Sequence, residues 1–193
     1  MKEFLHNYGY SSVKMFVNQF AISLFGAVLS MATTMAKSDI LAIITSILAI
    51  LFYLFLVYAL MWEVGAKDRI SVDIGKKQYR PHTGLAVAAV ASIPSLLIAI
   101  VYSIGYPFSA AHEWAGGLCV VASFFNMLLQ GMYFGLTSSI SFLGSTLNLF
   151  WLTHFVIIIP ALVTAWVAYY LGHKNKKFTT LFNYQSPDKA KKK

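Results

Sequence analysis

The sequence predicts an all-α fold, a polytopic transmembrane bundle of about five membrane-embedded helical segments, one of them a candidate re-entrant segment. Hydrophobic residues make up 58% of the 193 residues and charged residues only 11%, whereas soluble domains carry about 25% charged residues. Three long runs, 40–61, 83–112 and 114–173, contain no Asp, Glu, Lys or Arg. Because a hydrocarbon core takes roughly 20 helical residues, these runs hold at least four spans. Uninterrupted apolar runs favour helices over the alternating strands of a barrel.

Residues 1–172 are expected to form one helical domain, and its first two helices bracket a short turn. The first covers about 13–35 and contains the polar pair Asn18 and Gln19. The segment before it lacks the apolar core and small-residue cleavage site of a signal peptide, so this helix is expected to remain as a signal anchor. The second helix covers about 39–63 and stops at a densely charged stretch.

Three further helical segments are expected at about 84–105, 116–136 and 146–172. Pro94 and Pro160 stand near the middle of the first and last of these. A proline inside a helix removes one hydrogen bond and bends the axis. A static kink that shapes packing is commoner than a gate, so neither proline alone identifies a function.

Basic residues predict the orientation of the chain. The loop 66–82 and the tail 173–193 are rich in Lys and Arg, which favours a cytoplasmic position for both. A single crossing by the fourth segment would leave the tail outside. We therefore favour a hairpin in which 116–144 enters and returns, bent near Gly131 and Gly135. The alternative is a true span, a neutral cytoplasmic turn after it, and an external tail.

The charged stretch after the second helix is expected to be an interfacial clamp made of Trp62, Glu63, Lys67, Asp68 and Arg69. Trp is typical of the headgroup level, so Trp62 marks the depth at which the hydrocarbon ends. Glu63 is expected to pair with Lys67, four residues on, or with Arg69. Asp68 is expected to accept from Arg69 or from the loop lysines, so that surplus positive charge faces anionic lipid headgroups.

Polar residues inside the spans are the candidate substrate-binding residues. An amide without a partner in hydrocarbon costs a few kcal/mol, so each should face protein or water. Simple interhelical hydrogen bonds, worth around 0.6 kcal/mol each, are one interpretation and a solute site is the other. The candidates are Asn18, Gln19, Asn126, Gln130, Tyr133 and His154, of which Asn126 and Gln130 share one helical face.

Motifs for metals, cofactors and nucleic acids are not found. Cys119 is the only cysteine and lies in an apolar run, which favours a buried thiol over a metal ligand. No phosphate-binding loop, paired Cys/His spacing or Ser/His/Asp order is present. The net charge of +8 comes from residues beside the spans, which indicates anionic lipids and not nucleic acid as the partner. We therefore predict no cofactor and no metal.

Several runs carry a resemblance to a known group: "FYLFLVYALMWEVGAKDRISVD", "GLAVAAVASIPSLLIAI", "NMLLQGMYFGL" and "IIIPALVTAWVAYYLGHKN". From about residue 40 to 176 the chain resembles a family of small multi-pass membrane proteins of Gram-positive bacteria that has no assigned function. The W-E-x-G-x-K-D segment is its most particular part. The resemblance implies a bacterial plasma membrane and implies no reaction.

Three classes of function stay open at this point. A non-enzymatic solute-binding or transport component fits the intramembrane amides and the interrupted helices, and its partner would be a small solute. An accessory or scaffold subunit would bind a protein partner or a second copy. A lipid-acting enzyme is least favoured, because only Glu63 with Asp68, or His112 with Glu113, offers an acid–base pair near the interface. We assign no catalytic residue.

Overall fold

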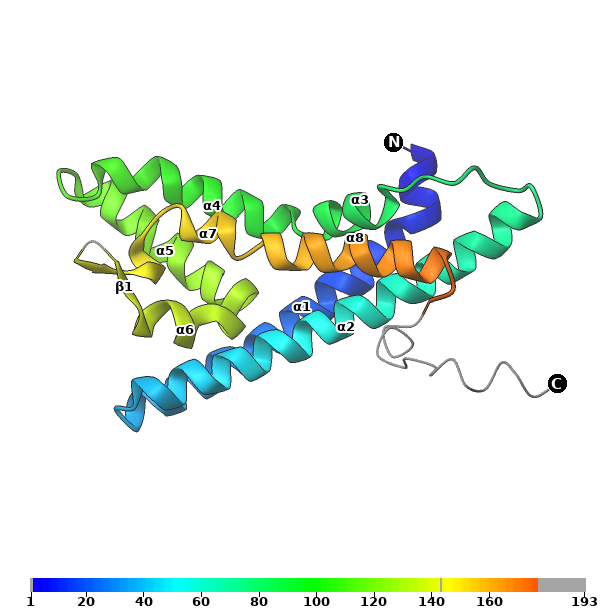
Figure 1. Cartoon of the computed structure of the whole chain (residues 1–193). Coiled ribbons are helices and arrows are strands. Elements are labelled where there is room, and N and C mark those ends of the chain that lie inside the picture. Colours follow the sequence, from blue (N-terminus) through cyan, green and yellow to red (C-terminus); the bar gives the residue numbers. More distant parts are fainter. Residues whose placement is uncertain (1, 143, 177–193) are drawn as a thin grey trace, which may run out of the picture.

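The computed structural model describes residues 2–142 and 144–176, and it is an all-α bundle as predicted (Figure 1). Its helices are α1 (Lys2–Met35), α2 (Asp39–Asp73), α3 (Thr83–Ala91), α4 (Ile93–Gly105), α5 (Glu113–Gln130), α6 (Phe134–Ser139), α7 (Thr153–Val156) and α8 (Ile159–His173). Single turns of 3-10 helix join some of them: η1 (Tyr106–Phe108), η2 (Gly131–Tyr133) and η3 (Leu147–Leu149). A minimal antiparallel pair, β1 (Ser141–Phe142) with β2 (Ser145–Thr146), precedes η3.

Four stretches of described helix are long and apolar enough to cross a membrane, and a fifth is the bent pair α3 and α4. Large apolar side chains on the outer face of α2, such as Leu48 at 61% and Phe55 at 61% exposure, would be unfavourable in water. The same side chains are suited to lipid. The protein is therefore an integral membrane protein.

The first two helices are longer than the sequence predicted. Helix α1 begins at Lys2 instead of residue 13, and α2 ends at Asp73 instead of residue 63. The extension of α2 carries two ion pairs spaced i,i+4, Glu63 with Lys67 and Arg69 with Asp73, which support a helix in water. At 1.5 Å per residue a helix of 35 residues is about 50 Å long, so α2 exceeds a 30 Å hydrocarbon core.

Both prolines begin helices, which corrects the expected kinks in the middle of helices. Helices α3 and α4 meet at Ser92 with a bend of 57°, and Pro94 stands in the first turn of α4. Pro160 likewise stands in the first turn of α8. A proline is favoured there because the first N–H groups of a helix have no intrahelical acceptor. The predicted single helix over 146–172 is wrong: residues 147–158 form η3, α7 and turns before α8 starts.

Helix α5 runs from one end of the bundle only to its middle. Near its start, the Cys119 thiol contacts the Tyr102 carbonyl of α4, and at its end the Gln130 amide donates to Ser95 near the start of α4. After α6 and η3 the chain is again beside Tyr102, whose hydroxyl donates to the Leu149 carbonyl at 2.9 Å. The segment 113–149 therefore enters and leaves at the same end of the bundle (Figure 1). This path has the shape of the predicted hairpin, but Glu113–Ser139 is also long and apolar enough to span, so re-entry into the membrane stays a prediction.

Glycines and serines make the turn of this hairpin possible. A Cβ on Gly131 would lie 2.5 Å from the Ser23 carbonyl oxygen, and one on Gly135 would lie 2.5 Å from Ser46 Oγ. The hydroxyl of Ser23 accepts from the Gly131 N–H, and Ser46 accepts from the Leu136 N–H at 3.1 Å. The backbone donors released by the break are thus satisfied by α1 and α2, as a membrane interior requires.

The two ends of the bundle differ in charge. The start of α1, the loop 74–82 and the end of α8 lie together, and we call this the basic end (Figure 1). The turn 36–38, the loop 106–112 and the β1–β2 hairpin lie at the opposite end. Among the Lys and Arg residues that the structure describes, Lys37 alone lies at that opposite end.

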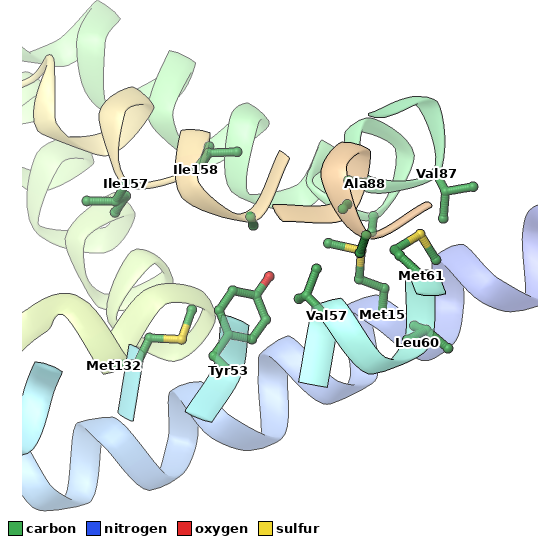
Figure 2. Packing of buried hydrophobic residues seen from close by; sticks show 14 of the residues in the cluster. Met15, Tyr53, Val57, Leu60, Met61, Val87, Ala88, Met132, Ile157 and Ile158 are labelled. Carbon is green, nitrogen blue, oxygen red and sulfur yellow. The ribbon is translucent and has the colours of Figure 1, made fainter. Parts of the chain in front are cut away.

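Small residues bring α8 close to α2 and α3. A Cβ on Gly65 or Gly84 would collide with the α8 backbone, and one on Gly172 would collide with the Trp62 carbonyl. Larger side chains fill the space beside this contact. Figure 2 shows them as sticks, with Met132 of the hairpin turn near Tyr53.

Candidate functional site

A cavity of about 90 Å³ lies beside the hairpin turn, between the α5–α6 segment and the η3–α7 segment. Eight of its lining residues have polar side chains and four have apolar ones, and none of them is Asp, Glu, Lys or Arg. The lining residues are Ser123, Asn126, Met127, Gln130, Tyr133, Phe134, Thr137, Asn148, Leu149, Thr153, His154 and Ile157.

Three of the lining side chains are buried with unsatisfied polar atoms. Gln130, Tyr133 and His154 are 4%, 5% and 3% exposed. Among the described residues, nothing hydrogen-bonds to Gln130 Oε1, to the Tyr133 hydroxyl, or to either ring nitrogen of His154. A buried polar atom without a partner costs about 1–3 kcal/mol. These four atoms belong to three side chains that line one cavity, which favours water or a ligand in that cavity as their partner.

Gln19 of α1 does not line the cavity but supports its wall through hydrogen bonds. Its Nε2 donates to Ser95 Oγ and to the Leu129 carbonyl, each at 3.1 Å, and its Oε1 accepts from the Tyr53 hydroxyl at 3.3 Å. Gln130 Nε2 donates to the same Ser95 Oγ at 3.3 Å. These bonds tie α1, α2, α4 and α5 together and fix Gln130 by its nitrogen, while its oxygen has no hydrogen-bond partner among the described residues.

His154 is held by ring packing. Its imidazole lies edge-to-face with Tyr102 of α4, with ring centroids 4.3 Å apart. A neutral imidazole offers one donor and one acceptor. Helix α7 is only four residues long, and His154 is its buried residue, with 3% of its surface exposed.

The structure brings together four of the six predicted substrate-binding residues: Asn126, Gln130, Tyr133 and His154 all line the cavity. Gln19 lies in the supporting network instead. Asn18 is half-buried and does not line the cavity, because neighbouring helical residues point about 100° apart. The sequence analysis missed Ser95 and Tyr53, and it also missed the lining residues Ser123, Thr137, Asn148 and Thr153. Asn148 and Thr153 were not recognised because residues 146–172 were predicted to form one continuous helix.

An apolar groove of about 460 Å³ adjoins the cavity. Tyr133, Thr137, Thr153 and Ile157 line both, so the two spaces lie next to each other. The remaining walls of the groove are Leu136, Ile140, Phe142, Leu147, Phe150, Leu152, Val156 and Pro160. The polar cavity is thus the inner end of a larger apolar recess.

A second polar cluster lies at the basic end and centres on Asp68. This carboxylate is in a residue only 5% exposed and accepts from the Tyr8 hydroxyl at 2.5 Å, the Tyr169 hydroxyl at 3.0 Å and Lys77 Nζ at 3.1 Å. Lys77 also lies over the Tyr8 ring, 4.8 Å from its centroid. One carboxylate therefore joins α1, α2, α8 and the loop 74–82.

The other members of the expected clamp lie around this cluster. Glu63 accepts from Lys67 at 2.7 Å, as expected, with both side chains more than half exposed. Arg69 pairs with Asp73 at 3.6 Å and not with Asp68. The Trp62 indole donates to the Lys176 carbonyl at 2.9 Å.

Two further candidates for chemistry are a metal site and the acid–base pair His112 and Glu113. The described residues contain no group of three or more His, Cys, Asp and Glu side chains that could hold a metal ion. His112 and Glu113 are exposed at the start of α5. Comparisons with protein-family models, with curated proteins and with solved structures gave no match.

Proposed function

We propose that this protein is a non-enzymatic solute-binding or transport component of a bacterial plasma membrane, with its site in the cavity beside the hairpin turn. One observation carries the proposal: Gln130, Tyr133 and His154 are buried, line one cavity, and each carries a polar atom without a hydrogen-bond partner among the described residues. If these side chains served only to form hydrogen bonds between helices, their polar atoms would be paired with other residues. They are not paired within the described residues.

The helix interruptions support a binding role. The break at Ser92 is three residues from Ser95, which holds Gln130, and η2 contains Tyr133. Irregular backbone at membrane depth is tolerated where protein buries it or where it lines a cavity, and transporters bind substrates at such places. The basic end is then cytoplasmic, where its cations face anionic lipid headgroups.

Tyr133→Phe tests the proposal without disturbing the fold. The change removes a hydroxyl that no described residue bonds, so the melting temperature of the ligand-free protein should stay equal or rise. Stabilisation by a bound solute should fall. The assay is a thermal-shift screen of polyols, amides and nucleosides with purified protein, followed by native mass spectrometry of any co-purifying molecule.

Tyr53→Phe is the matched control, since its hydroxyl donates to Gln19 and does not line the cavity. It should lower stability by about 0.5–1.5 kcal/mol and keep the response to solute. Loss of stability in Tyr133→Phe with no effect on binding would refute the proposal. A stoichiometric protein that co-purifies in place of a small molecule would favour the accessory-subunit alternative.

A further inference from the structure

The geometry points to a more specific ligand: we propose an uncharged amphiphile whose hydroxyl or amide head occupies the cavity and whose aliphatic chain lies in the adjoining groove. The inference rests on the proposed function, because it names the class of molecule that the same site takes. It starts from the position of the two spaces side by side, with Tyr133, Thr137, Thr153 and Ile157 in the walls of both.

The cavity selects an uncharged head. Its lining residues include no Asp, Glu, Lys or Arg, and the buried His154 imidazole is expected to be neutral because no carboxylate lines the cavity, so an ionised phosphate, carboxylate or ammonium would have no counter-charge there. Gln130 Oε1 requires a donor, the Tyr133 hydroxyl can donate or accept, and neutral His154 offers one of each. A hydroxyl or a primary amide both donates and accepts, and therefore matches all three groups.

The groove accommodates an apolar chain. Its own walls are almost entirely aliphatic and aromatic, and at its rim Phe142 and Val156 are 54% and 50% exposed. The groove is therefore open at the surface of a bundle whose outer faces are apolar, and a lipid-soluble molecule can enter from the side.

Selectivity comes from the head. Lipid tails are as apolar as the groove, so transfer of a chain from the bilayer into it gains little. Hydrogen bonds to the unsatisfied atoms of the cavity are lost when the head stays among other lipids. A molecule with the same chain and a charged head should therefore occupy the groove no better than bulk lipid does.

The test uses the full-length protein in nanodiscs of phosphatidylcholine, with native mass spectrometry as the readout. The probes are 1-monoolein and oleamide, with oleoyl lysophosphatidylglycerol as the charged probe of equal chain and glycerol as the head without a chain. At least one neutral probe should give a saturable one-to-one adduct. The charged probe and glycerol should not.

Three variants locate the adduct. Tyr133→Phe removes a cavity hydroxyl, and Val156→Trp fills the groove from an exposed rim position. Each should weaken the neutral adduct about tenfold, the loss expected for one well-placed contact. Val163→Trp is the matched control, because Val163 is 51% exposed but lines neither space, and it should leave binding unchanged.

The outcomes separate this inference from the proposed function. Binding of glycerol or another soluble solute that depends on Tyr133 but not on Val156 would leave the proposed function standing and overturn the amphiphile. Equal adducts with neutral and charged probes, insensitive to Tyr133→Phe, would mean surface lipid only and also overturn it. If neither the oleoyl probes nor the soluble panel bind, both proposals fail.

Discussion

Ser23→Ala tests whether a side chain of α1 holds the hairpin turn. The Ser23 hydroxyl accepts from the Gly131 N–H and donates to the Met127 carbonyl at 3.3 Å, and the side chain is fully buried. Alanine would leave that N–H without an acceptor inside the bundle. An orphaned buried donor costs about 1–3 kcal/mol, and single hydrogen bonds in membrane proteins contribute up to about 1.7 kcal/mol. We therefore expect a loss of about 1–3 kcal/mol.

Ser30→Ala is the control on the same helix. Ser30 is 2% exposed, yet its hydroxyl has no hydrogen-bond partner among the described residues. Its removal should be neutral or slightly stabilising, because alanine is a better helix former and loses no bond. Both variants delete one oxygen from a buried serine, so differences in volume cancel between them.

Reversible unfolding by SDS in mixed micelles, followed by circular dichroism, gives the free energy of each variant. Hydrogen exchange of the peptide around Gly131 adds a local readout, which should accelerate in Ser23→Ala and not in Ser30→Ala. Equal changes in both variants, in stability or in exchange at Gly131, would show that the serine hydroxyl does not hold the turn.

Three further predictions concern other parts of the chain. Asp68→Asn should cost about 1–3 kcal/mol in the same assay, because its carboxylate is buried among three donors, whereas Glu63→Gln should cost less than about 0.5 kcal/mol in an exposed pair. Equal costs would contradict this ranking. Gly172→Ala should cost about 1–3 kcal/mol through collision with α2, whereas Gly117→Ala, with open space around it, should be neutral or stabilising, as SDS titration can show. A stabilised Gly172→Ala would refute the close contact. A cysteine at Ser109 should react with an impermeant thiol reagent in intact cells, while one at the basic end should be protected, and the reverse pattern would invert the proposed orientation.

Hydropathy and the absence of charge were enough to predict the membrane helices, because lipid allows few alternatives to a helix. The spacing of Asn126 and Gln130, followed by Tyr133, was enough to predict one polar face. That face lines the cavity in the structure. The distribution of Lys and Arg also favoured the hairpin over a straight span, and the contacts of both Cys119 and Leu149 with Tyr102 agree with a chain that turns back.

Long-range partners could not be predicted from the sequence. Glu63 was expected to pair with Lys67, four residues away, and Asp68 with Arg69 or the loop lysines; the structure has the first pair exposed and pairs Asp68 with Lys77. Asp68 is the buried carboxylate, and its partners Tyr8 and Tyr169 come from distant parts of the chain. Likewise, no local signal says that Gly172 faces the Trp62 carbonyl.

The positions of the cavity and of the helix breaks have one physical cause. A regular helix forms all its backbone hydrogen bonds internally, so only its side chains contact neighbouring helices. A bundle of unbroken apolar helices therefore rarely encloses a polar cavity. Here two interruptions border the same recess, since η2 contributes Tyr133 and the break before Pro160 adjoins the groove. A third, at Ser92, lies three residues before Ser95, which accepts a hydrogen bond from Gln130. At the hairpin turn, serines on α1 and α2 accept the released backbone donors. Because these serines bond the Gly131 and Leu136 N–H groups, the side chains of Gln130 and Tyr133 beside the turn are not needed for that purpose, and their unsatisfied polar atoms can bond a ligand.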